Sequence, residues 1–212
     1  MSGSMLVTRP DHEIVTKYCC VWSERLVKLA QQKGLHVYDL KGAKATRRNF
    51  ESYVKKNQPS LIFLNGHGSA EVVTGYDNEP LADMASEPAV SIFYARSCDA
   101  AALLGPALVQ KGARAFVGYV RKFVLYYDPE YTMRLEEDPM AGLFLDSSNL
   151  VVSTLLKGHA VAEAHRRSKE VMAKNLRKMI SSAATPEERY AASAMWSNMT
   201  NQVALGDLDA TI

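Results

Sequence analysis

Cysteine is scarce in this chain, which contains only Cys19, Cys20 and Cys98. Three cysteines, two of them adjacent, do not make a disulfide framework, and so sparse a supply is typical of a reducing cytoplasm. Cys19 and Cys20 fall within a predicted helix, where cysteine usually serves as a small buried hydrophobic residue. The odd count leaves one thiol free for chemistry, and we expect it to be Cys98.

Long hydrophobic runs and a strong charge bias are also absent. No apolar run reaches the roughly 18 residues that a membrane-spanning helix needs, and 25 basic against 23 acidic residues give a net charge of +2. We therefore expect neither a membrane nor nucleic acid as a partner. No basic segment followed by a long apolar core begins the chain, so no secretory signal is expected and the predicted location is the cytoplasm.

The 212 residues show no linker, repeat or low-complexity tract, which favours one domain. Residues 1–4 are typical of a vector-derived extension, so the predicted domain comprises residues 5–212. Apolar segments of strand character alternate with helical patterns along it. The expected strands are 5–8, 35–40, 61–64, 90–95, 113–120 and 202–207, and the expected helices are 14–30 (capped by Asp11), 46–56, 99–111, 140–156, 159–181 and 186–199.

The expected strands are apolar on both faces and the links between elements are short, which predicts an α/β fold with a parallel sheet covered by helices. Two segments depart from the alternation. Residues 71–74, with a turn at 76–80, predict a short hairpin arm. Residues 121–139 are irregular, aromatic and charged, and a loop of that length is often functional or mobile.

Residues 60–101 contain two apolar strands that end in chemically active residues. SLIFLNGHGS ends at His67, and VSIFYARSCDA ends at Cys98. If the two strands are parallel neighbours, both side chains emerge at the carboxyl edge, where open α/β sheets place their sites. A thiol and an imidazole at one edge are the parts of a nucleophile and its base.

Cys98 stands directly before a helix predicted to begin at Asp99. A helix N-terminus lowers the pKa of a thiol, because it places partial positive charge beside the sulfur. Its N–H groups can also stabilise an oxyanion. The competing interpretation is a buried core cysteine, the common state of a free cysteine, and the position of Cys98 at a strand end argues against it.

His67 lies between Gly66 and Gly68. Either the glycines serve a turn in which His67 is incidental, or they keep the imidazole accessible and leave the Gly68 N–H as an oxyanion donor. The other histidines lie beside helices or at the amino end of a strand: His12, His36, His159 and His165. A zinc site would need four ligands, and no CxxC or HxxxH spacing completes one. GxGxxG and GxxxxGKS are missing as well, so neither a metal nor a cofactor is expected.

These motifs carry a family resemblance. An apolar strand, His-Gly, about thirty residues, a second apolar strand and Ser-Cys-Asp resemble the caspase-type (clan CD) cysteine peptidases, in particular the gingipain-like and CHAT branches. KGARAFVGYV, LLKGHAVAEAHRRSKE and ALGDLDATI are similar to further segments of those branches. The resemblance implies a caspase-like three-layer sandwich, with a mostly parallel six-stranded sheet flanked by helices. It also implies a Cys98–His67 dyad and an oxyanion site formed by the backbone N–H groups of Gly68 and Cys98.

The implied activity is that of a cysteine endopeptidase acting on a protein or peptide. Cys98 attacks the peptide carbonyl, His67 protonates the leaving amine, and water releases the acyl-enzyme. The trigger, whether an activating protein partner, a metal ion or self-cleavage, is left open. Two alternatives also stay open: a catalytically silent caspase-like interaction or adaptor domain, and a flavodoxin-like small-molecule binder.

In the family, a charged pocket at the same edge receives the side chain before the scissile bond. Arg9 and Arg96 would favour an acidic side chain there, through bidentate pairing with a carboxylate. Asp39 and Asp99 would serve a basic one instead, and Arg96 could equally be a structural salt-bridge partner. In metacaspases an aspartate stands two residues before the cysteine, and Arg96 departs from that pattern. The sequence therefore predicts that an acidic side chain is preferred before the scissile bond.

Overall fold

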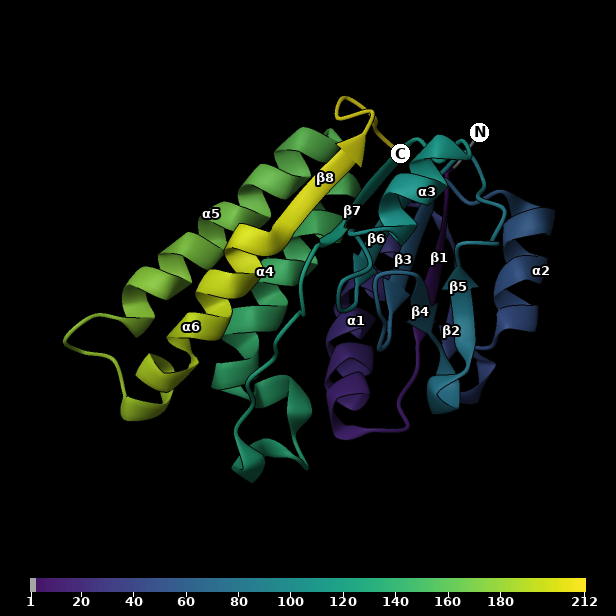
Figure 1. The fold of residues 1–212 in the computed structure, drawn as a ribbon. Coiled ribbons are helices and arrows are strands. Elements are labelled where there is room, and N and C mark those ends of the chain that lie inside the picture. The colour runs from purple at the N-terminus through teal and green to yellow at the C-terminus, as the bar shows by residue number, and fades with distance from the viewer. Residues whose placement is uncertain (1–2) are drawn as a thin grey trace.

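The structure is a computed structural model, and it describes residues 3–212. The expected N-terminal extension therefore lies partly outside the described residues. Its last residue, Ser4, begins the first strand, where its N–H donates to Ser60 Oγ at 3.2 Å. The molecule is a mixed α/β structure in which a central sheet lies between two layers of helices (Figure 1).

The central sheet has six strands in the order β2-β1-β3-β6-β7-β8. All neighbours are parallel except β8, which runs antiparallel to β7. The six predicted strands and the predicted sheet are confirmed. Their bounds are β1 Ser4–Arg9, β2 His36–Lys41, β3 Leu61–Asn65, β6 Ile92–Arg96, β7 Ala115–Tyr119 and β8 Gln202–Gly206.

A helical layer covers each face of the sheet, as the alternation of apolar side chains along the strands requires. Phe63 packs into a core with four helices, and its neighbour Leu64 packs into a second core with two helices on the opposite face. The first layer comprises α1 Ile14–Gln32, α4 Pro139–Leu155, α5 Val161–Met179 and α6 Pro186–Asn201. The second comprises α2 Arg47–Asn57 and α3 Leu104–Gln110. Figure 1 shows the two layers on either side of the strands.

The short hairpin after β3 is present as predicted. It consists of β4 Val72–Thr74 and β5 Pro80–Asp83, joined through the one-turn helix η2 Tyr76–Asn78. Gly68 forms an additional isolated bridge with Val73. The stretch that contains His67 is therefore joined to the hairpin, which forms a small sheet separate from the central one.

The prediction of a helix beginning at Asp99 is wrong. Asp99 has a φ of 57°, a left-handed backbone that cannot start a right-handed helix, and a bend at residues 98–99 leads into turns at residues 100–103. The Ala102 N–H donates to the Asp99 carbonyl at 2.8 Å, and α3 begins only at Leu104. Cys98 is therefore separated from the helix by an irregular loop.

The segment between β7 and α4 is irregular, as expected, but it is tethered at several points. It holds two one-turn helices, η3 Pro129–Tyr131 and η4 Leu135–Glu137. Asn198 of α6 bonds both the N–H and the carbonyl of Val124, at 2.9 and 2.7 Å. Tyr18 donates to Asp138 at 2.7 Å, near the end of the segment. Within residues 3–212, no helix combines the length and the apolar character that crossing a membrane would require.

Candidate active site

The pairing of β3 with β6 brings His67 and Cys98 to the same edge of the sheet. Asn65 and Arg96 are partners in the parallel register, and each is followed two residues later by His67 or Cys98. Neighbouring strands lie about 4.8 Å apart. The two side chains singled out by the sequence therefore leave adjacent strands at equivalent positions.

Close packing of the backbone accounts for the glycines on either side of His67. A Cβ on Gly66 would lie 2.0 Å from the Thr74 carbonyl oxygen. A Cβ on Gly68 would lie 2.2 Å from Ser97 Oγ and 3.3 Å from the carbonyl oxygen of Cys98. Any side chain at Gly68 would thus push the His67 loop away from the Cys98 loop.

The His67 ring is held by a carboxylate from another element. Its Nε2 lies 2.9 Å from Glu13 Oε2, and 39% of the side chain is exposed. Its Nδ1 has no hydrogen-bond partner among residues 3–212. Its backbone carbonyl accepts from the Thr74 N–H at 2.9 Å, which fixes the loop against the hairpin. The ring therefore has one nitrogen engaged and one free.

Glu13 is a site residue that sequence analysis missed. It stands directly before α1, and its Oε1 accepts from Asn78 Nδ2 at 3.1 Å. The hydrogen bonds from Asn78 and His67 lower the pKa of Glu13 below its usual value. The available signal was its position after β1, whose carboxyl end lies at the same edge as those of β3 and β6.

The Cys98 thiol is partly buried beneath the segment that follows β7. Its Sγ–H donates to the Phe123 carbonyl at a sulfur–oxygen distance of 3.7 Å. Burial raises the pKa of Cys98, contrary to the lowering that the sequence predicts, because no helix N-terminus lies behind the sulfur. Burial raises the pKa of Cys19 and Cys20 too, and both of those side chains belong to the interior.

Two backbone donors at this edge are unused. Within the described chain, neither the Gly68 N–H nor the Cys98 N–H donates a hydrogen bond to any group. In its bridge with Val73, Gly68 occupies the position whose N–H points away from the partner strand. Free N–H groups beside a nucleophile are the groups that an oxyanion requires.

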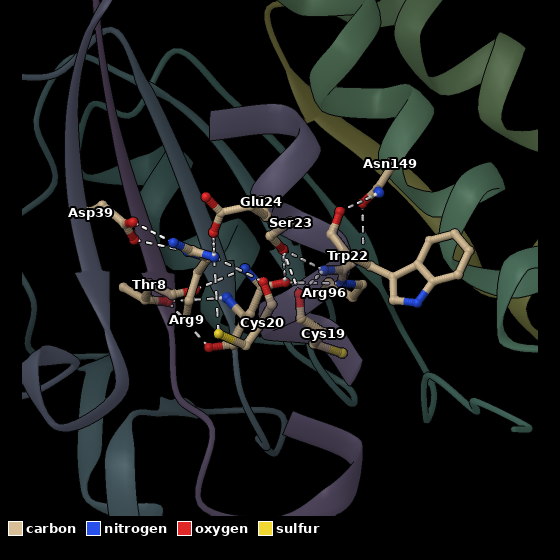
Figure 2. Close-up of polar contacts among 11 residues, drawn as sticks. Thr8, Arg9, Cys19, Cys20, Trp22, Ser23, Glu24, Asp39, Arg96 and Asn149 are labelled. Atoms are coloured by element: carbon tan, nitrogen blue, oxygen red, sulfur yellow. Dashed lines mark hydrogen bonds and ion pairs between the residues drawn. The ribbon is translucent and has the colours of Figure 1, made fainter. Parts of the chain in front are cut away.

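Arg9 and Asp39, both predicted substrate-binding residues, bind each other. The Arg9 side chain is 2% exposed; its Nε donates to Asp39 Oδ1 at 2.9 Å, and Nη1 lies 2.7 Å from Glu24 Oε2. Burial opposes the charge of Arg9, but hydrogen bonds to Asp39 and Glu24 outweigh it and raise the pKa of Arg9. Figure 2 shows the guanidinium between the two carboxylates. These contacts engage the Arg9 guanidinium in the interior, so that it is not available to pair with the carboxylate of a substrate.

Arg96 is buried as well, with 1% of its surface exposed. Nε donates to Asn65 Oδ1 at 2.9 Å and Nη1 to Asn149 Oδ1 at 2.8 Å. Nη2 donates to Ser23 Oγ at 2.7 Å and to the Cys19 carbonyl at 3.0 Å, as Figure 2 shows. The geometry therefore contradicts a substrate-binding role for Arg96 and agrees with a structural one, although its partners are neutral and not carboxylates.

Asp99 alone among the four predicted substrate-binding residues has neither an ion-pair partner nor a side-chain hydrogen bond in the described chain. It follows Cys98 directly, its side chain is part-exposed, and its N–H donates to the Arg121 carbonyl at 3.2 Å. Of the four residues, Asp99 is therefore the one whose charge is not engaged by another side chain of the described chain.

His12 is a further polar residue beside His67 that sequence analysis set aside. Its side chain is 9% exposed, and neither ring nitrogen has a hydrogen-bond partner among residues 3–212. The ring packs edge-on against His67 and Tyr76, with centroid distances of 6.4 and 5.3 Å. No group of three or more potential metal ligands occurs within residues 3–212.

Comparisons with known proteins agree with this architecture. No protein-family model matches the chain, and no curated protein sequence matches it. The fold is similar to that of the complex of the Porphyromonas gingivalis RgpB pro- and mature domains, with a TM-score of 0.63, 9% identity and coverage of 99% of this chain and 48% of that one. It is also similar to the Arg-specific cysteine proteinase gingipain R (RgpB), with a TM-score of 0.61, 10% identity and coverage of 99% and 47%.

The chain thus spans about half the length of these structures. The class of fold follows from the comparisons: it is the caspase-like α/β fold of the gingipain cysteine proteinases. At 9% and 10% identity the likeness concerns the fold alone.

Proposed function

We propose that this chain is a cysteine endopeptidase in which Cys98 is the nucleophile and His67 the general acid and base. The observation that carries the proposal is the register of β3 and β6, which places the two residues at equivalent positions on neighbouring strands of a gingipain-like sheet. The close approach of Gly68 to Ser97 and Cys98 supports it, since the two loops lie against each other there. The Nδ1 of His67 has no partner within residues 3–212 and can accept the proton of the thiol.

In this mechanism the thiol passes its proton to His67 as the sulfur attacks the peptide carbonyl. Burial raises the pKa of Cys98 and so favours the thiol over the thiolate before the substrate binds. The N–H groups of Gly68 and Cys98 stabilise the oxyanion of the tetrahedral intermediate. His67 then protonates the leaving amine, and water attacks the acyl-enzyme to release the acid. Glu13 keeps the ring oriented through Nε2.

The charge distribution supports a basic residue before the scissile bond, which was the alternative to the acidic preference. The guanidinium groups of Arg9 and Arg96 are buried and bonded to interior partners. The Asp99 carboxylate has no ion-pair partner within residues 3–212. Gingipain R, whose fold this chain resembles, is an Arg-specific proteinase. We include the same preference in the proposal, with Asp99 as the residue of this chain that would supply the negative charge.

Cleavage of matched peptides by purified protein tests the proposal. A fluorogenic peptide with arginine before the scissile bond should be cleaved, and its glutamate counterpart should be a poor substrate. Cys98→Ala should abolish cleavage while leaving the urea unfolding midpoint close to that of the parent, because the side chain is only partly buried. Asp99→Asn should reduce discrimination between the two peptides.

A peptide chloromethyl ketone provides a second readout, because it alkylates an activated thiol in a substrate site. Mass spectrometry should find the label on Cys98 and not on the interior thiols of Cys19 and Cys20. Cys20→Ala is the matched control and should leave cleavage unchanged. Cleavage retained by Cys98→Ala would refute the assignment of the nucleophile.

A further inference from the structure

A cavity of about 870 Å³ lies between the segment after β7 and the ends of three helices. Its walls are residues 126–130, the start of α4, the end of α5 and the start of α6. None of the proposed catalytic residues lines it. Ligand sites typically have volumes of about 300–1,000 Å³, so this one has room for a short peptide segment.

Tyrosine rings form one wall of the cavity. The rings of Tyr126 and Tyr190 meet edge to face, with centroids 5.7 Å apart and an interplanar angle of 84°. Tyr126 is supported from behind by Phe144, at 6.1 Å, whereas Tyr190 is 74% exposed and stands at the opening. The face of a tyrosine ring attracts lysine and arginine side chains.

The charged groups around the cavity are mostly acidic. Asp128, Glu130, Glu187 and Glu188 line it together with one cation, Lys178. Four carboxylates and one ammonium group leave a net charge of about −3 at neutral pH. Lys178 is engaged by Glu188 at 2.9 Å. Within residues 3–212, Glu130 and Glu187 have no ion-pair partner, so their charges are open to a ligand.

We propose that this cavity binds a basic peptide segment, with lysine or arginine side chains placed between the tyrosine rings and the carboxylates. The combination of rings and negative charge fits a cationic side chain, and it repels nucleic acid, phosphate and acidic peptides. Binding here requires no catalysis and is independent of the proposed peptidase activity.

The test uses the Cys98→Ala chain, so that no cleavage disturbs the titration. The probe is a blocked pentapeptide with lysine and arginine at its second and fourth positions, and the reference is the same peptide with glutamine at both. Isothermal titration at low salt should show saturable binding of the basic peptide and at least about tenfold weaker binding of the glutamine peptide. Added salt should weaken binding of the basic peptide.

Variants of exposed residues localise the site. Tyr190→Ala should weaken binding about fivefold, and Tyr190→Phe should retain it because the ring remains. Glu130→Gln combined with Glu187→Gln should weaken binding about tenfold. Glu136→Gln is the control for charge, since Glu136 is exposed in η4 and lies outside the cavity. Unchanged urea midpoints should accompany all of these variants.

Equal affinity for the two peptides would overturn the proposal, as would an undiminished affinity in the Glu130 and Glu187 double variant. A loss in Glu136→Gln as large as in the double variant would overturn it too, because it would indicate a diffuse electrostatic effect. These failures are distinguishable from failure of the peptidase proposal, since Cys98→Ala removes the nucleophile from the experiment.

Discussion

At the scale of single residues, the orientation of His67 depends on Glu13, which is 54 residues away in the sequence. The imidazole donates or accepts through two distinct nitrogens, and the engagement of one determines which is left for the thiol. Because hydrogen bonds from Asn78 and His67 lower the pKa of Glu13, its carboxylate stays charged to a lower pH than that of an ordinary glutamate. The Glu13–His67 contact should therefore persist throughout the mildly acidic range.

Two replacements of Glu13 should show whether its hydrogen bond, which orients the His67 ring, or its negative charge matters for activity. We expect Glu13→Ala to lower kcat/KM about a hundredfold, because a ring free to rotate misplaces the proton donor. Glu13→Gln should lower it much less, since the amide oxygen can still accept from Nε2–H. The measurement is steady-state cleavage of the arginine peptide, with circular dichroism to confirm folding. Equal losses in the two variants would mean that the charge of Glu13, and not the positioning of the ring, is required.

The residue scale also shows where sequence analysis succeeds and where it fails. His67 and Cys98 could be found because each ends an apolar strand, and strand ends meet at a predictable edge. The place of Arg96 two residues before Cys98 could not decide between the substrate-binding and the structural role that the sequence left open. Successive side chains of β6 point to opposite faces of the sheet. Arg96 therefore lies on the same face as Tyr94, where α1 and α4 bury it.

At the scale of elements, the segment after β7 covers the proposed nucleophile. Phe123 accepts the thiol hydrogen bond, and the next residue, Val124, is fixed by Asn198 of α6. Sequence analysis identified the segment as irregular, since it lacks periodicity, but its anchor on α6 could not be predicted. The start of α3 was also misplaced, because the left-handed backbone of Asp99 results from local packing that a helical pattern does not reveal.

Releasing this anchor should expose the thiol. Asn198 is 1% exposed, and Asn198→Ala leaves the N–H and the carbonyl of Val124 without partners. We expect a loss of about 1–3 kcal/mol in the free energy of unfolding, together with faster alkylation of Cys98 by iodoacetamide. Thr200→Ala, an exposed change on the same helix, is the control. An alkylation rate equal to that of the parent would show that the segment does not limit access to Cys98.

At the scale of the whole molecule, two buried arginines join the sheet to one helical layer. Arg9 connects β1 to β2 and α1, and Arg96 connects β6 to β3, α1 and α4. Figure 2 shows both guanidinium groups among these elements. The alternation of strands and helices predicts the layers, because apolar patterning determines which faces are buried. It does not predict polar contacts between layers, since their partners come from distant parts of the chain.

Arg96 is the decisive case for this structural role, because the sequence alone leaves two roles open for it, binding an acidic substrate and a structural contact. We expect Arg96→Met to lower the free energy of unfolding by about 3 kcal/mol or more, since Asn65, Asn149 and Ser23 lose a charged donor in the interior. Urea denaturation followed by tryptophan fluorescence measures the change. Arg121→Met, an exposed arginine beyond β7, is the matched control and should leave the midpoint unchanged. If Arg96→Met were as stable as the parent and instead changed the preferred residue before the scissile bond, Arg96 would be a substrate-binding residue after all.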